Sequence, residues 1–286
     1  MSQPAADIRR ILFPFDFSPQ GLQAAPFVRS LAQRVGASVT VLSVVPLNVA
    51  LMPVGMDDDV AVWTNTLRTR LDEAFAAEFE GVDVRRITDA GDPGERIVAT
   101  AQTEGADLIM MPTHGLGLFR TMLVGSVASK VLHDATCPVW TAAHAEEQGV
   151  GGLPRTVVCA VDGRDESRRL LEWADRFTTR IGAALKVLHV VGPVTDWPSL
   201  EGERILQEQE RQEAEAQVAA IEAAAGVEAP LLAAVGRIVT TVADYARSEH
   251  ADLIIIGRGS LHEPLGWLRT HAFGIIQRSP CPVLSV

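Results

Sequence analysis

An internal repeat constrains this chain more than any other feature of its sequence. Three pairs of segments carry the repeat: GASVTVLSVV (36–45) with GAALKVLHVV (182–191), ADLIMMP (106–112) with ADLIIIG (251–257), and TCPVWTA (136–142) with PCPVLSV (280–286). The offset between the two copies stays between 144 and 146 residues, a drift too small to arise from chance matches. The chain is therefore a duplicated unit, and what one half folds into predicts the fold of the other.

Each half alternates short β-branched runs with longer helical patterns, which is typical of βαβ units around a parallel sheet. Runs such as VTVLSVV (39–45) are apolar throughout, as expected for strands that helices cover on both faces. The predicted strands are 10–15, 38–45, 82–88, 107–112 and 137–142, and then 156–161, 184–191, 229–234, 252–256 and 281–286. The predicted helices are 19–35, 57–80, 93–104 and 126–134 in the first half, and 199–225 in the second. The sequence therefore predicts an α/β fold of two tandem domains, each with an open, doubly wound, Rossmann-like five-stranded parallel sheet.

The boundary between the two copies falls in a stretch of different composition. Residues 144–154, HAEEQGVGGLP, are polar and then Gly-rich, which favours a linker. We expect a first domain at 1–145, a linker at 146–154 and a second domain at 155–286.

Charge and cysteine content exclude several classes of function. The formal net charge is −11, which argues against nonspecific binding to nucleic acid or to anionic membranes. No run of about 18 apolar residues is present and the first residues contain no apolar stretch, so neither a membrane span nor a signal peptide is expected. The three cysteines form no C-x-x-C pair, and the histidines show no metal-ligand spacing. We expect a cytoplasmic protein with buried, inert cysteines and no metal site of its own.

The loop after the fourth strand of the first copy, within 111–132, has features of a phosphate site. Gly125-Ser126 opens the next helix, where free N–H groups and the helix dipole attract anions. His114-Gly115 lies at the strand exit, within reach of a ribose or phosphate. The alternative is a plain turn and helix cap, because Gly-rich loops and Gly-Ser caps are common. The chain has neither a P-loop nor a dinucleotide-binding fingerprint.

These residues resemble the universal stress protein family, over nearly the whole length of each copy. ATP-binding members of that family carry G-x-x-G, nine residues and then G-[ST] after the fourth strand. The first copy has Pro112-Thr113-His114-Gly115, nine residues and then Gly125-Ser126, so Pro112 replaces the first glycine. Pro112 lacks an N–H, so any contact from that amide is lost.

The resemblance also implies which residues hold the nucleotide. Asp16 falls where a first-strand Asp of the family meets the adenine or ribose, and Val44 falls where a second-strand backbone meets the adenine. The residues implied at the ligand are Pro14, Asp16, Val44, Met111, His114, Gly115, Gly125, Ser126 and Val127.

The second copy preserves this motif less well. Gly257 is present, but Ser260 replaces the second glycine, and the helix start becomes Thr270-His271 or Arg269-Thr270. Larger side chains there would crowd a polyphosphate, although Asp162 and Val190 remain at the adenine end. We expect the second copy to bind ATP weakly or not at all.

Three functions are consistent with these residues. The first is a regulatory, stress-response protein that binds ATP with Mg²⁺ in its first domain, with no fixed catalytic residues. The second is a slow ATP hydrolase that depends on His114 and Asp16. The third is a nucleotide-free scaffold acting through dimerisation. The resemblance further implies that the last strand of each copy pairs with its twin, giving a homodimer or a pseudo-dimeric monomer.

Overall fold

The computed structural model of the 286-residue chain describes residues 7–47, 57–75, 78–112, 125–142, 152–192, 200–258 and 267–286. These residues fall into two compact units, one from Asp7 to Leu153 and the other from Pro154 to Val286. Each unit is described below by itself.

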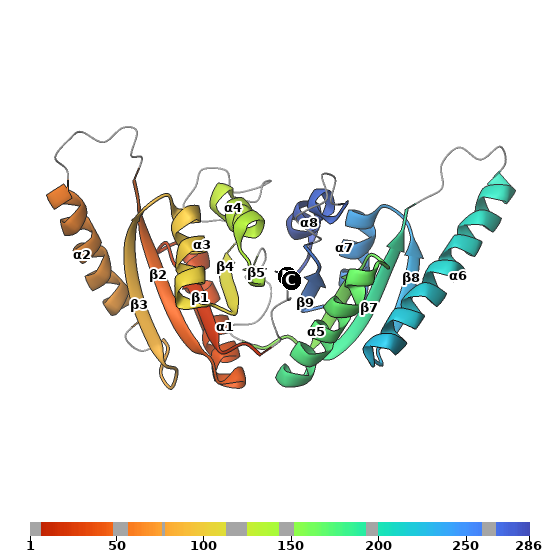
Figure 1. The fold of residues 1–286 in the computed structure, drawn as a ribbon, viewed down its shortest axis with the longest axis horizontal. Coiled ribbons are helices and arrows are strands. Elements are labelled where there is room, and N and C mark those ends of the chain that lie inside the picture. Colours follow the sequence, from red (N-terminus) through yellow and green to blue (C-terminus); the bar gives the residue numbers. More distant parts are fainter. Residues whose placement is uncertain are drawn as a thin grey trace. The chain divides into compact units, whose positions relative to one another are not determined.

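The first unit contains five strands and four helices among its described residues (Figure 1). The strands are β1 (Arg10–Pro14), β2 (Ser38–Pro46), β3 (Val84–Gly91), β4 (Leu108–Pro112) and β5 (Val139–Ala142). The helices are α1 (Pro19–Val35), α2 (Asp57–Ala74), α3 (Pro93–Glu104) and α4 (Ser126–Asp134). The alternation of strand and helix is the one that the sequence predicts.

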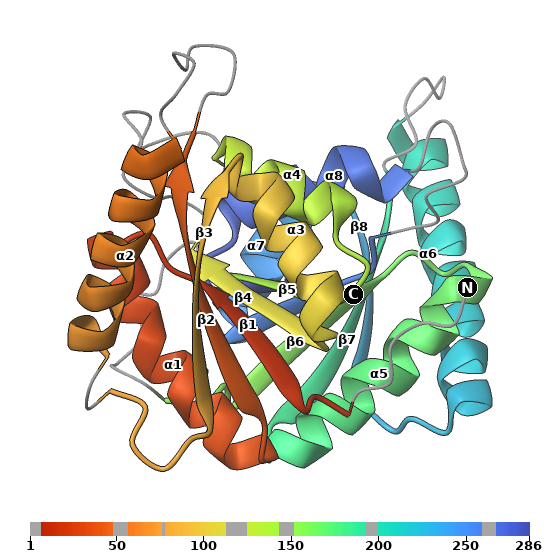
Figure 2. The ribbon, with the colours of Figure 1, turned by 60° about the vertical axis from the view of Figure 1, so that its left-hand side comes forward.

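The sheet of the first unit has the order β3-β2-β1-β4-β5, and its described pairs are parallel. Helices α1 and α2 lie on one face, and α3 and α4 pack together on the other (Figure 2). The order reverses between β1 and β4, because the chain first winds outward through β2 and β3 and then returns. In open parallel sheets such a reversal leaves a crevice at the carboxyl ends of the two strands.

The second unit repeats this arrangement. Its strands are β6 (Thr156–Val161), β7 (Ala184–Val191), β8 (Leu231–Val235), β9 (Leu253–Ile256) and β10 (Val283–Ser285). Its helices are α5 (Asp165–Ile181), α6 (Leu200–Ala225), α7 (Ile238–Ser248) and α8 (Trp267–Arg278). The strand order β10-β9-β6-β7-β8 places the reversal between β6 and β9.

Local sequence signals account for the helix ends. The hydroxyl of Ser18 accepts a hydrogen bond of 3.1 Å from the amide of Gly21, and Pro19 occupies the first turn of α1. Gly36 ends the same helix in the left-handed region, with φ 67° and ψ 35°. The prediction of a helix over 57–80 is too long, because α2 ends at Ala74. The chain turns there so that Phe75 and Phe79 both pack against Phe13 in the core.

The cysteines lie in the cores. Cys137, Cys159 and Cys281 are buried free thiols, and burial raises the pKa of Cys281 to about 12. Burial, together with the nearby carboxylate of Glu222, also raises the pKa of Cys159. Because the thiolate is the reactive form, these two thiols are inert at neutral pH.

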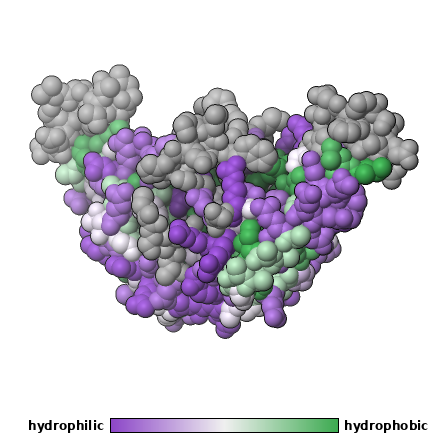
Figure 3. All heavy atoms as spheres, turned by 45° about the vertical axis from the view of Figure 1, so that its right-hand side comes forward, coloured by the Kyte–Doolittle hydropathy of each residue, from purple (hydrophilic) through white to green (hydrophobic). Residues whose placement is uncertain are grey.

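The described surface is largely hydrophilic on one face of the molecule. On the face that Figure 3 shows, hydrophilic side chains cover much of the described surface, with smaller apolar patches between them. Among the described residues, no helix combines the length and the apolar character needed to cross a membrane.

Candidate functional site

The predicted site residues of the first unit lie at the carboxyl ends of its strands. Pro14 is the last residue of β1, Val44 lies in β2, and Met111 lies in β4. Asp16 follows β1 by two residues and is exposed, whereas Pro14 and Met111 are buried. His114 and Gly115 lie outside the described residues.

Pro14 ends the pairing between β1 and β4. The β1–β4 register runs only from Ile11↔Leu108 to Leu12↔Ile109, although β4 continues to Pro112. The amide of Phe15 donates to the carbonyl of Leu42 on β2, over 2.8 Å. Since successive amides of a strand point to opposite sides, the nitrogen of Pro14 faces β4. Pro14 has no N–H to donate, so the ladder stops and the two strands are left unpaired at the reversal point.

The early end of this ladder exposes a backbone acceptor that the sequence alone does not reveal. The amide of Ile109 donates to Pro138 on the β5 side, so the carbonyl of Met110 faces β1. It faces β1 at the place where Pro14 has no N–H to offer. The sequence feature that could have predicted this acceptor is Pro14, because a proline in a strand lacks the N–H that would pair with a neighbouring carbonyl.

Val44 presents its backbone to the same crevice. The pairing of β1 with β2 ends at Pro14↔Leu42, while β2 continues to Pro46. Because the carbonyl of Leu42 faces β1, the N–H and C=O of Val44 point the same way, beyond the end of β1. A donor and an acceptor side by side suit the edge of a heterocyclic base.

Asp16 stands in a tight turn between β1 and α1. Its Oδ1 accepts a hydrogen bond of 3.0 Å from the amide of Ser18, and its Oδ2 has no partner within the described part of the chain. Phe17 adopts φ 60°, a left-handed conformation that is uncommon for a bulky residue. The guanidinium of Arg70 lies 4.5 Å from the centre of the Phe17 ring, so α2 contacts this turn. The turn thus holds a carboxylate oxygen free beside the crevice.

The start of α4 supplies unpaired amides. Gly125 is the N-cap residue, with no side-chain cap, and the first hydrogen bond of the helix runs from Ser129 N to Gly125 O, over 2.8 Å. The N–H groups of Ser126, Val127 and Ala128 precede that bond and have no partner within the helix. No acidic residue lies in the first turn, so the positive end of the helix dipole is not neutralised there.

The nearest lysine of this helix is engaged elsewhere. The ammonium of Lys130 lies 3.5 Å from carboxylate oxygens of both Glu95 and Asp134. Partial desolvation opposes the charge, but Asp134 and Glu95 together raise the pKa of Lys130. An anion at the start of α4 would therefore rely on backbone amides and the helix dipole rather than on this ammonium.

The second unit pairs the backbone groups that the first unit leaves without a strand partner. The β6–β9 register continues to Ala160↔Ile256, two residues further than its counterpart, because Ala160 has the N–H that Pro14 lacks. The β6–β7 register also runs one residue further than the β1–β2 register, to Val161↔His189. This last pair uses the N–H of Val190, the residue that corresponds to Val44.

The helix start of the second unit corrects the sequence-based alignment. The motif predicts a start at Thr270-His271 or Arg269-Thr270, but α8 begins at Trp267. Thr270 and His271 are thus the fourth and fifth residues of the helix, and the N–H groups without an intrahelical partner are those of residues 267–269. Ser260 lies outside the described residues, and Gly257 directly follows β9.

A search for metal ligands gives no site. Within the described ranges, no group of three or more His, Cys, Asp or Glu side chains is arranged to hold a metal ion.

Comparison with known proteins places both halves in one family. The model of the universal stress protein family matches residues 7–142 and again residues 154–286. Universal stress protein MJ0577 of Methanocaldococcus jannaschii is 28% identical over 149 residues, which covers 46% of this chain and 92% of that protein.

Solved structures show the same likeness. A universal stress protein from Archaeoglobus fulgidus covers 99% of this chain and 97% of its own, with a TM-score of 0.69 and 22% identity. A universal stress protein solved in complex with cAMP covers 47% of this chain and 98% of its own, with a TM-score of 0.37 and 22% identity. With two matches of the family model that together span nearly the whole chain, this protein belongs to the universal stress protein family and carries two of its domains in tandem.

Proposed function

We propose that the first unit binds ATP, together with Mg²⁺, and that the bound nucleotide regulates the protein rather than being turned over. The observation that carries the proposal is the combination of amides without a helix partner at the start of α4 with a β1–β4 ladder that ends at Pro14. The two features lie at the same end of the sheet, since α4 follows β4 at its carboxyl end.

The groups divide into a base end and a phosphate end. The backbone of Val44 and the carbonyl of Met110 would meet the adenine edge, and the free carboxylate oxygen of Asp16 would accept a ribose hydroxyl. The amides at 126–128 and the Ser126 hydroxyl would hold phosphate oxygens, as helix N-termini do in many nucleotide sites. Mg²⁺ would arrive with the triphosphate, where it balances charge that no nearby lysine supplies.

The second unit would not share this ligand. Its strand ladders pair the backbone groups that would meet the base, and α8 begins at Trp267, before the residues that align with Gly125-Ser126. The proposal therefore predicts one nucleotide per chain, not two.

Calorimetric titration of the full chain with Mg-ATP tests the proposal. We expect saturable heat with one site per chain, and a rise in stability of about 2.7 kcal/mol when the free nucleotide is 100 times its Kd. Absence of both heat and a melting shift at millimolar nucleotide would reject nucleotide binding and leave a scaffold function. Steady release of phosphate, faster than about one turnover per minute, would instead support a hydrolase.

Dimerisation through the last strands, β5 and β10, stays a prediction. Sedimentation of the full chain with and without Mg-ATP would measure the oligomeric state and its dependence on nucleotide.

A further inference from the structure

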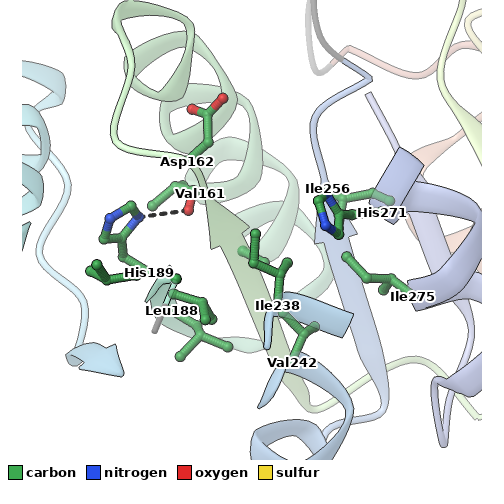
Figure 4. Close-up of a pocket in the computed structure, with 13 residues that line it drawn as sticks. Val161, Asp162, Leu188, His189, Ile238, Val242, Ile256, His271 and Ile275 are labelled. Carbon is green, nitrogen blue, oxygen red and sulfur yellow. Dashed lines mark hydrogen bonds between the residues drawn. The ribbon is translucent and has the colours of Figure 1, made fainter. Parts of the chain in front are cut away.

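The second unit contains a cavity of about 230 Å³ at the carboxyl ends of β6, β7 and β9 (Figure 4). Helices α7 and α8 close it from one side, through Ile238 and Val242 on α7 and Ile275 on α8. Nine of its thirteen lining residues are aliphatic: Ala160, Val161, Leu188, Val190, Val191, Ile238, Val242, Ile256 and Ile275. The volume is below the roughly 300–1,000 Å³ of pockets for drug-sized ligands, so it suits about one ring system.

The polar groups of the cavity are few. Among the lining residues that the structure describes there is no lysine or arginine, and the ionisable ones are Asp162, His189 and His271. The Nδ1 of His189 donates to the carbonyl of Val161 over 2.9 Å, and the ring lies beside Gly163, at the turn into α5. Figure 4 shows this hydrogen bond, with His271 on the other side of the cavity.

Asp162 brings a negative charge to the rim. Its Oδ1 accepts hydrogen bonds from the amide of Arg164, over 3.1 Å, and from the hydroxyl of Ser167, over 2.8 Å. These bonds hold the carboxylate in place at the turn into α5. A ligand phosphate near this rim would meet like charge.

We propose that this cavity binds a small, uncharged, mainly apolar ring compound that carries no phosphate. Aliphatic walls provide the affinity by removing apolar surface from water. The two copies of the duplicated domain would then bind different ligand classes. This inference concerns the second unit alone and does not depend on nucleotide binding by the first.

The test compares 1-naphthol with 1-naphthyl phosphate, which share a ring and differ by the phosphate. Both are titrated into the full chain by calorimetry. We expect naphthol to bind at least about tenfold more tightly than naphthyl phosphate.

Two variants on α7 locate the binding site. Ile238→Phe adds a ring at a half-buried lining position and should weaken naphthol binding at least about tenfold. Thr240→Phe adds the same ring to the same helix, outside the lining, and should leave naphthol binding unchanged. If either variant fails to fold, methyl chemical shifts of the unmodified chain decide, since naphthol should move those of Ile238, Val242 and Ile275.

Several results would overturn the inference. The first is that naphthol does not bind. The second is that naphthol binds, but neither Ile238→Phe nor the methyl shifts place it at the cavity. The third is that naphthyl phosphate binds at the cavity as tightly as naphthol. Mg-ATP titration of Ile238→Phe separates this inference from the proposed function, because the first unit should still take up nucleotide.

Discussion

Replacing Ser126 by Asp should remove nucleotide binding while leaving the protein at least as stable. Ser126 is the exposed first residue of α4, where no acidic residue lies in the first turn. A carboxylate there complements the helix dipole and contributes about 0.3–1 kcal/mol to stability. The melting temperature should therefore rise by about 1–4 °C.

The same carboxylate would lie against the phosphates. Two unit charges about 4 Å apart repel by about 4 kcal/mol at an effective dielectric constant of 20, and salt screening lowers this at an exposed position. We therefore expect Ser126→Asp to weaken Mg-ATP binding by about 2–4 kcal/mol, or about 30- to 1,000-fold.

Calorimetric titration and thermal melting of the same samples give both numbers. Gln102→Glu serves as the control, because it makes the same charge change on an exposed residue near the far end of α3. The reasoning would be refuted if Ser126→Asp bound Mg-ATP as tightly as the unmodified chain. It would also be refuted if Gln102→Glu lost binding to the same degree.

Three further predictions follow from other parts of the structure. Pro14→Ala gives β1 the N–H that faces Met110, so it should extend the β1–β4 ladder and weaken Mg-ATP binding. Amide exchange would measure the ladder, and calorimetry would measure the affinity. Faster exchange at β1 with unchanged affinity would contradict this prediction. Glu222 is buried, its Oε1 has no hydrogen-bond partner, and burial raises its pKa. The ordinary pKa of a glutamate is about 4.5, so the stability of the chain should fall as the pH rises from that value through the raised pKa. Glu222→Gln should therefore stabilise the chain by about 1 kcal/mol at pH 8 and by nothing near pH 4 in urea unfolding, and an equal effect at both pH values would refute the reasoning. Ser18→Ala removes the cap of α1 and should lower the free energy of unfolding by about 1 kcal/mol, with Ser30→Ala in the same helix as the comparison.

The sequence predicts the elements well because their signals are local. Helix α1 begins and ends at the predicted residues, since Ser18, Pro19 and Gly36 act through caps within one turn. Helix α2 is shorter than predicted because its end depends on where Phe75 and Phe79 reach the core, a tertiary contact that periodicity does not contain.

The site is predicted less completely than the fold. The resemblance gives Pro14 and Val44 as ligand residues, but the part of Pro14 in ending a strand ladder depends on which neighbour its nitrogen faces. The start of α8 at Trp267 is missed for a related reason. Counting residues from the strand motifs assumes that the helix begins at the same place in both copies, and the structure shows that it does not.

A crystal structure of the full chain grown with Mg-ATP tests the central claim most directly. The account predicts one nucleotide per chain, with phosphate oxygens within hydrogen-bond distance of the amides at 126–128 and the base beside Val44. Triphosphate bound at α8 of the second unit, or a first unit that stays empty at saturating Mg-ATP, would contradict it.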